Sequence, residues 1–168
     1  MSNTLIIDDG TQTLTNKTIT NPVISKIVST SNGDIVLEPN GTGIVKGTIK
    51  RFQVQLLAND TDQATATKIG GDYRISDKAI TVVGVGAYVD TAGVTGTSTI
   101  DINEAGTSIL STKITIDTTE KSSEGATTPP VISDSAIAAN AIISFDLDAI
   151  HSGTAAKGLK VFVDYIYT

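Results

Sequence analysis

The chain has 168 residues, of which 12 are Lys or Arg and 18 are Asp or Glu, so its formal net charge is -6. This acidic balance lacks the basic surface that nucleic-acid binding requires, and the absence of Cys excludes disulfides, thiolate metal sites and cysteine nucleophiles. Thr, Ile and Val together make up 61 residues. These β-branched side chains favour strands over helices, so the composition predicts an all-β protein.

Residues 1–50 are predicted to form an extended arm of short strands. Isolated apolar residues stand in polar surroundings, and Asn32-Gly33 lies between two β-prone segments as in a tight hairpin. Strands this short are not stable by themselves in water. They therefore pack on the following domain or pair with other copies, unless they form a loosely ordered tail. The residues expected to make assembly contacts are Leu14, Ile19, Val23, Ile27, Ile35 and Leu37.

Residues 51–168 are predicted to form a single antiparallel β-sandwich with jelly-roll-like organisation. Apolar and polar residues alternate in segments near 52–56, 80–89, 99–103, 108–116, 143–148 and 159–166, and the polar stretches 59–71 and 117–128 are expected loops. About seven or eight strands at this spacing are typical of a sandwich. The predicted core comprises Phe52, Val54, Leu56, Val83, Val85, Ile100, Ile102, Ile114, Ile116, Phe145, Leu147, Val161 and Val163.

Within the predicted 80–89 strand, Gly84 and Gly86 alternate with the valines assigned to the core. They are expected on the opposite face, where another group can approach the backbone closely.

Residues that could carry catalysis or bind a metal do not form a recognisable constellation. His151 is the only histidine, and it is expected in an exposed loop without a second imidazole for a metal site. Asp146 and Asp148 share the outward face of one strand, which favours hydration over acid–base chemistry. Asp60 and Asp62 offer oxygen ligands for a cation but lack the other ligands of a calcium loop. We therefore expect neither enzymatic activity nor a cofactor. No apolar run reaches the about 18–20 residues of a membrane helix, so no membrane association is expected.

Several segments resemble structural proteins of tailed bacteriophages. Residues 11–19 (TQTLTNKTI) resemble a segment of phage fibres and surface proteins, and residues 32–43 (NGDIVLEPNGTG) resemble an element of thin trimeric β-stalks. Residues 100–117, 120–122, 128–132 and 157–161 are similar to β-sandwich modules of phage virions. The resemblance implies a virion component that is usually a homotrimer.

Two features select among the possible virion roles. The chain has one small predicted knob, and it lacks the larger tip or hydrolase domain that fibres and tailspikes carry. We therefore expect a capsid decoration (cement) protein on the outer capsid surface, made in the host cytoplasm, whose partners are its own copies and the major capsid protein. A short tail-fibre or adaptor protein is the alternative. A receptor- or glycan-binding module would use the loops at 61–71 and 117–128.

Overall fold

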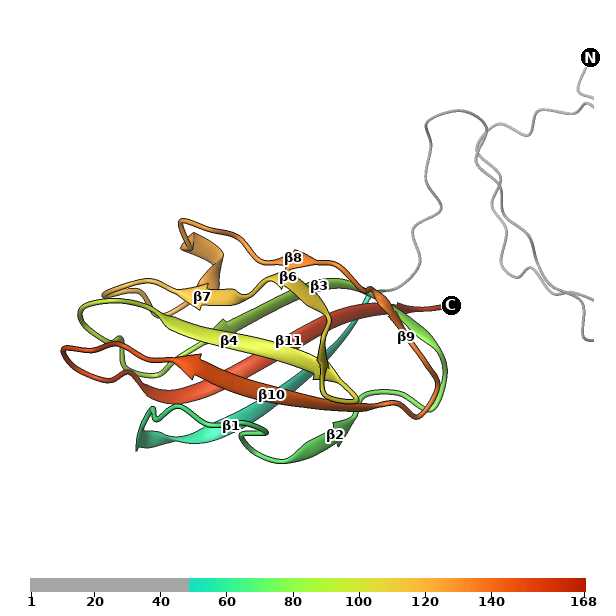
Figure 1. The fold of residues 1–168 in the computed structure, drawn as a ribbon, viewed down its shortest axis with the longest axis horizontal. Helices are drawn as coiled ribbons and strands as arrows, with labels where there is room; N and C mark the ends of the chain where they lie inside the picture. Colours follow the sequence, from blue (N-terminus) through green and yellow to red (C-terminus); the bar gives the residue numbers. More distant parts are fainter. Residues whose placement is uncertain (1–48) are drawn as a thin grey trace, which may run out of the picture. The chain divides into compact units, whose positions relative to one another are not determined.

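The computed structural model describes residues 49–168, and these form a nearly all-β domain (Figure 1). A single 3-10 turn, η1 (Ser123–Gly125), interrupts the strands of this part of the chain. The strands are β1 (Lys50–Asp62), β2 (Asp72–Arg74), β3 (Ile80–Tyr88), β4 (Ser98–Glu104), β5 (Thr107–Ser108), β6 (Leu110–Thr112), β7 (Ile114–Ile116), β8 (Val131–Ile132), β9 (Ala136–Ile137), β10 (Ile142–Ala149) and β11 (Lys157–Tyr167).

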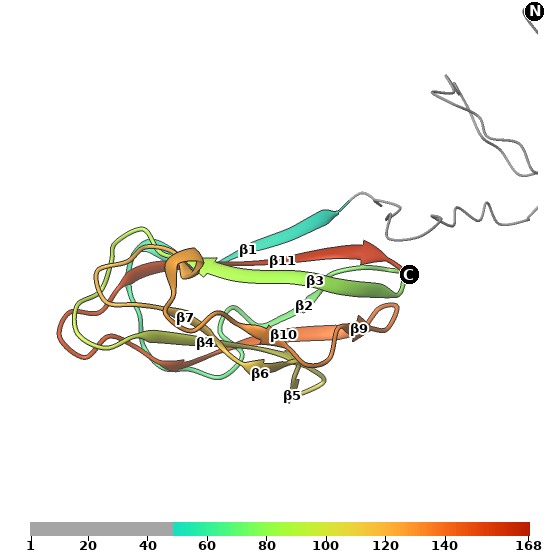
Figure 2. The same ribbon diagram turned by 90° about the horizontal axis from the view of Figure 1, so that it is seen from above.

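The strands form two main antiparallel sheets that lie one above the other in Figure 2. One sheet has the order β1-β11-β3-β9, and the other has the order β2-β10-β4-β5, with β7 also paired to β4. Eight strands remain when the short strands β5, β6 and β8 are left out. Counted in chain order, the first, eighth, third and sixth of these (β1, β11, β3 and β9) form one sheet. The second, seventh, fourth and fifth form the other. This is the jelly-roll arrangement, and it confirms the predicted antiparallel sandwich.

One apolar cluster fills the sandwich. Nine residues of the predicted core are buried, namely Leu56, Ile100, Ile102, Ile114, Ile116, Phe145, Leu147, Val161 and Val163, while Phe52, Val54 and Val85 are partly buried against them. On the side where β1 and β2 form the sheet edges, the Tyr73 ring packs edge-on between those of Phe52 and Phe145, with centroid distances of 6.0 and 5.6 Å. These aromatic contacts join the two sheets along that side.

The prediction that Val83 belongs to the core is wrong. Val83 is 44% exposed, whereas its neighbour Val82 is 3% exposed. The cause is a β-bulge: Gly84 pairs with Asp164 and Val82 pairs with Tyr165, so Val83 has no partner on β11. One extra residue reverses the alternation of faces, and the side chains before the bulge change sides relative to the simple pattern.

The strand boundaries differ from the prediction at the polar end of β1. Residues 59–62, expected in a loop, extend the strand, and Asp62 pairs with Lys157 after a register shift. Asp60 and Asp62 are thus exposed strand residues, and Lys157 Nζ lies 3.6 Å from Asp62 Oδ1. The arm residues and the type of contact predicted for them lie outside the described residues.

Candidate functional site

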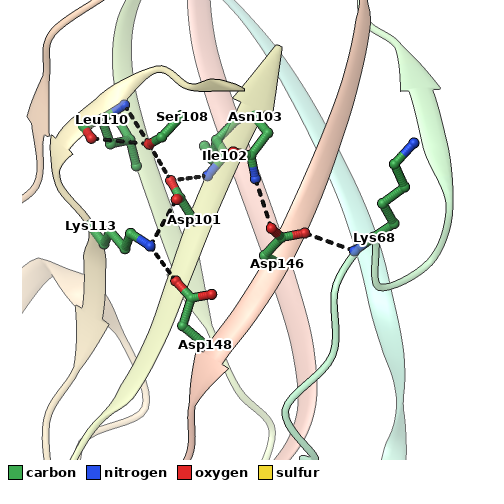
Figure 3. Close-up of polar contacts among 9 residues, drawn as sticks. All are labelled: Lys68, Asp101, Ile102, Asn103, Ser108, Leu110, Lys113, Asp146 and Asp148. Carbon is green, nitrogen blue, oxygen red and sulfur yellow. Dashed lines mark hydrogen bonds and ion pairs between the residues drawn. The ribbon is translucent and has the colours of Figure 1, made fainter. Parts of the chain in front are cut away.

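A network of charged side chains lies on the face of β4 and β10 that is turned away from the core (Figure 3). At its centre is Asp101, whose side chain is only 6% exposed. Its Oδ1 accepts hydrogen bonds from the Ser108 hydroxyl at 2.6 Å and the Ile102 amide at 2.8 Å. Its Oδ2 lies 3.0 Å from Lys113 Nζ, and the same ammonium donates to Asp148 Oδ2 at 2.6 Å. One lysine therefore bridges a buried and a half-exposed carboxylate.

The chain after β4 buries Asp101 by turning back over its own strand. Ala105 and Gly106 both have positive φ, at 49° and 85°, between the paired residues Glu104 and Thr107. This is the pattern of a two-residue hairpin turn with left-handed central residues. The turn brings Ser108 beside Asp101, so a carboxylate that a strand pattern places outward becomes covered.

Asp146 connects this face to the segment between β1 and β2. Its Oδ2 accepts from Asn103 Nδ2 at 3.1 Å, and its Oδ1 accepts from the Lys68 backbone amide at 2.7 Å. In Figure 3 the Lys68 backbone approaches β10 from the side opposite Lys113. The carboxylate therefore anchors a connecting segment to the sheet.

The arrangement is suited to holding the fold together. Hydrogen bonds to Asp148 and then to Asp101 raise the pKa of the Lys113 side chain, which keeps it a cation. Asp101, Asp146 and Asp148 each accept a hydrogen bond from a fixed donor. Within residues 49–168, no group of three His, Cys, Asp or Glu side chains is placed to hold a metal ion.

The prediction that His151 is exposed is wrong, because the ring is buried with 2% exposure. Its Nδ1 lies 2.9 Å from the Ser98 hydroxyl, which donates to Gln63, and its Nε2 lies 3.3 Å from the Asp117 carbonyl. Two loops fold over the ring: Ser152 N donates to Thr95 O, and Gly153 N donates to Val94 O. The ring also fills the space left by the missing side chain of Gly93.

Two open hollows lie beside the loops that a ligand-binding module would use. One, of about 540 Å³, is lined by five threonines together with Gly96 and Asp117. The other, of about 350 Å³, is lined by Thr65, Ala66, Thr67, Leu147 and Asp148. The residues that line them supply hydroxyls and carboxylates but no aromatic ring on which a sugar could stack.

On the outward face of the β1-β11-β3 sheet, an aromatic ring is clamped between a glycine and an arginine. A Cβ on Gly86 would lie 2.4 Å from the Phe162 ring, so the ring rests directly on the backbone, as the glycine pattern predicted. The Arg51 guanidinium lies 3.9 Å from the ring centroid on β11 and makes two 2.7 Å hydrogen bonds to Asp164. These contacts fix the side chains on this face.

Comparisons of the chain with protein-family models, with curated proteins and with solved structures found no match. Residues 49–168 include no helix of the length and apolar character needed to cross a membrane. The fold and the contacts described above are therefore the basis for inferring function.

Proposed function

We propose that this chain is a structural protein of a tailed-bacteriophage virion, and specifically a homotrimeric capsid decoration protein that attaches to the major capsid protein and stabilises the head shell. The amino-terminal 48 residues supply the attachment arm, and the jelly roll is the knob. The sequence resemblance of residues 11–19 and 32–43 to phage virion proteins supports this role. Jelly rolls are also common in viral capsid and lectin domains, although a fold does not by itself assign a function.

The observation that carries the proposal is the place where the described chain enters the knob. Lys50, the first residue of β1, pairs with Tyr165 near the end of β11, and β1 is an edge strand of its sheet. The described chain therefore begins at the end of the knob that also holds the C-terminus marked in Figure 1. In the proposed assembly, the arm continues from this end toward the shell, and the opposite end of the knob faces outward.

The hydrogen bonding of the buried polar atoms in the knob is consistent with a structural role. Among the described residues, every buried side-chain nitrogen or oxygen has a hydrogen-bond partner. In the proposed assembly, the arm contacts the shell through strand addition, in which main-chain hydrogen bonds give affinity and alternate side chains give register. Three weak arms in one trimer gain affinity because the second and third contacts become intramolecular.

The test is to follow binding of full-length variants to purified virions. Leu14→Ser combined with Ile19→Ser removes two apolar anchors of the arm, and Thr13→Ser combined with Thr18→Ser is the matched control at neighbouring polar positions. We expect the first variant to be released from heads while its β circular dichroism is unchanged, and the control to stay bound. The depleted heads should also lose resistance to heat or osmotic shock.

Two outcomes would contradict the proposal. Full occupancy and full resistance of heads carrying the Leu14/Ile19 variant would show that the arm is not the clamp. Electron microscopy that finds the protein only on tails would favour the alternative, a short tail-fibre or adaptor protein. In that case the two hollows beside the 61–71 and 117–128 loops become candidates for receptor contact.

A further inference from the structure

The outward face of the β1-β11-β3-β9 sheet carries a row of apolar side chains at the end that holds Lys50. On β11, Ile166 pairs with Thr81 of β3, and Thr81 pairs with Ala136 of β9. Ile49 directly precedes β1 and is 62% exposed, and strand alternation places it on the same face as Arg51. With the exposed Val83 on β3, this end of the face presents mainly apolar side chains from all four strands, with the Thr81 hydroxyl among them.

The β3 bulge is what adds Val83 to this row. In a regular strand that followed the pairing of Val85 and Val163, Val83 would face the core, as the sequence pattern predicted. The unpaired position instead turns a β-branched apolar side chain to the surface and leaves it 44% exposed. Bulges commonly re-aim a side chain in this way near binding surfaces.

The cover over this sheet face stops before the apolar row. At the far half, the Ser123 hydroxyl of η1 accepts a hydrogen bond from the Ala87 amide of β3. Nearer Lys50, the surface consists of the Phe162 ring under Arg51 and then the apolar row. An arginine stacked on an aromatic ring beside aliphatic side chains is a composition typical of protein interfaces. Because Arg51 and Phe162 are already held by their contacts with each other, with Asp164 and with Gly86, little conformational entropy of these two side chains is lost when they are covered.

We propose that this half of the sheet face, formed by Ile49, Val83, Ile166 and Phe162, packs against a second copy of the same chain in the assembled oligomer. The inference rests on the proposed homotrimer, and it names the surface of the knob that the trimer uses. The 48 preceding residues join the knob at Ile49. If these residues associate between copies, the neighbouring knobs are tethered next to this surface, and the tether raises their effective concentration there.

Electrostatics also favours this surface over other faces for contact between copies. Each chain has a net charge of -6, so close approach through acidic regions is repulsive. On the proposed surface, Asp164 is neutralised by its two hydrogen bonds to Arg51. This surface can therefore approach a neighbouring copy in the trimer with less repulsion than an acidic face would meet.

The experiment compares three full-length variants by sedimentation and light scattering over a range of protein concentrations. Val83→Asp and Ile49→Asp place a carboxylate in the proposed interface, and Val94→Asp is the matched control. Val94 is 46% exposed, close to the exposure of Val83, but it lies in a loop that bridges to Thr154 at the other end of the sandwich. Far-UV circular dichroism verifies that each variant is folded.

We expect the wild type and Val94→Asp to be trimers with the same concentration dependence. The concentration for half-dissociation should rise at least tenfold for Val83→Asp and Ile49→Asp, because a charge is buried at the interface. If Val83→Asp unfolds because it lies at the β3 bulge, Ile49→Asp still tests the surface, since Ile49 lies outside the strands. A trimeric wild type whose two interface variants also remain trimers would overturn the proposed surface alone. A monomeric wild type at all concentrations would overturn the proposed homotrimer and the surface with it.

Discussion

Substitution of Gly93 by Ala tests whether the buried His151 is locked in place. An ideal Cβ on Gly93 would lie 2.3 Å from Cγ and 2.4 Å from Nδ1 of His151, distances that no folded protein tolerates. Gly93 does not have positive φ, so the alanine backbone itself is unstrained. The ring cannot turn aside without losing its contacts to the Ser98 hydroxyl and the Asp117 carbonyl.

The expected cost combines two effects. Overpacking a filled interior costs about 1–3 kcal/mol, and breaking the hydrogen bond between the buried imidazole Nδ1 and the Ser98 hydroxyl costs about 1–3 kcal/mol more. We expect Gly93→Ala to lower the free energy of unfolding by about 3 kcal/mol, which for a domain of this size lowers the melting temperature by about 10 °C. Denaturant and thermal unfolding of the full-length protein measure both quantities.

A double-mutant cycle identifies the clash as the cause. His151→Ala would not remove the clash, because alanine keeps the Cβ atom at position 151, and an ideal Cβ on Gly93 would lie 2.7 Å from it. In a His151→Gly background, Gly93→Ala should cost less than about 1 kcal/mol. Gly125→Ala is the control, since a Cβ there meets no atom of the described chain within 4 Å. An equal cost of Gly93→Ala in both backgrounds would refute the steric explanation.

Two further predictions concern charged side chains. Lys113→Ala should lower the free energy of unfolding by about 1–2 kcal/mol, because it leaves the buried Asp101 without its cation. Lys157→Ala, at the same 41% side-chain exposure, is the control and should lower it by less than about 0.5 kcal/mol. Equal losses for the two variants in denaturant unfolding would contradict this explanation. Hydrogen bonds from the Thr127 amide and hydroxyl lower the pKa of Asp117 in the folded protein. The ionised carboxylate therefore contributes its full stabilisation above the pKa of an unfolded Asp, about 3.9, and this stabilisation is lost as the pH falls through the folded-state pKa. Asp117→Asn should therefore be less stable than wild type at pH 7, and the difference should shrink below about pH 4; a difference that is constant with pH would argue against this linkage.

The sequence predicted the strands whose two faces differ strongly. In β10, Ile143, Phe145 and Leu147 alternate with polar residues, and all three are buried in the structure. Alternation is reliable there because the pairing with β4 keeps one register over these positions. It failed at Val83, because a bulge is a property of how two strands pair and leaves no mark in the hydropathy of one strand.

The polar clusters were less predictable than the strands. The alternation in residues 99–103 places Asp101 on the face opposite Ile100 and Ile102 and does not predict its burial, which arises because a turn with two left-handed residues brings Ser108 over it. His151 was expected in solvent, and its burial arises from contacts between two loops far apart in the sequence. Gly93 was the one available signal, since a glycine in a loop can mark a close approach, but its partner cannot be inferred from local sequence.

The position of β11 has a consequence for how the protein is made. This strand, Lys157–Tyr167, is the last in sequence order among the described strands, yet it lies between β1 and β3 and pairs with both along most of its length. During synthesis, β1 and β3 therefore have no common neighbour until residue 167 has left the ribosome. The four-stranded sheet can close only once β11 has been made, through pairings that span 95–115 residues with β1 and 72–87 residues with β3, and folding dominated by such distant contacts is slow. In the interval the growing chain exposes the edges of β1 and β3, so low temperature or slow expression should increase the yield of native protein over aggregates.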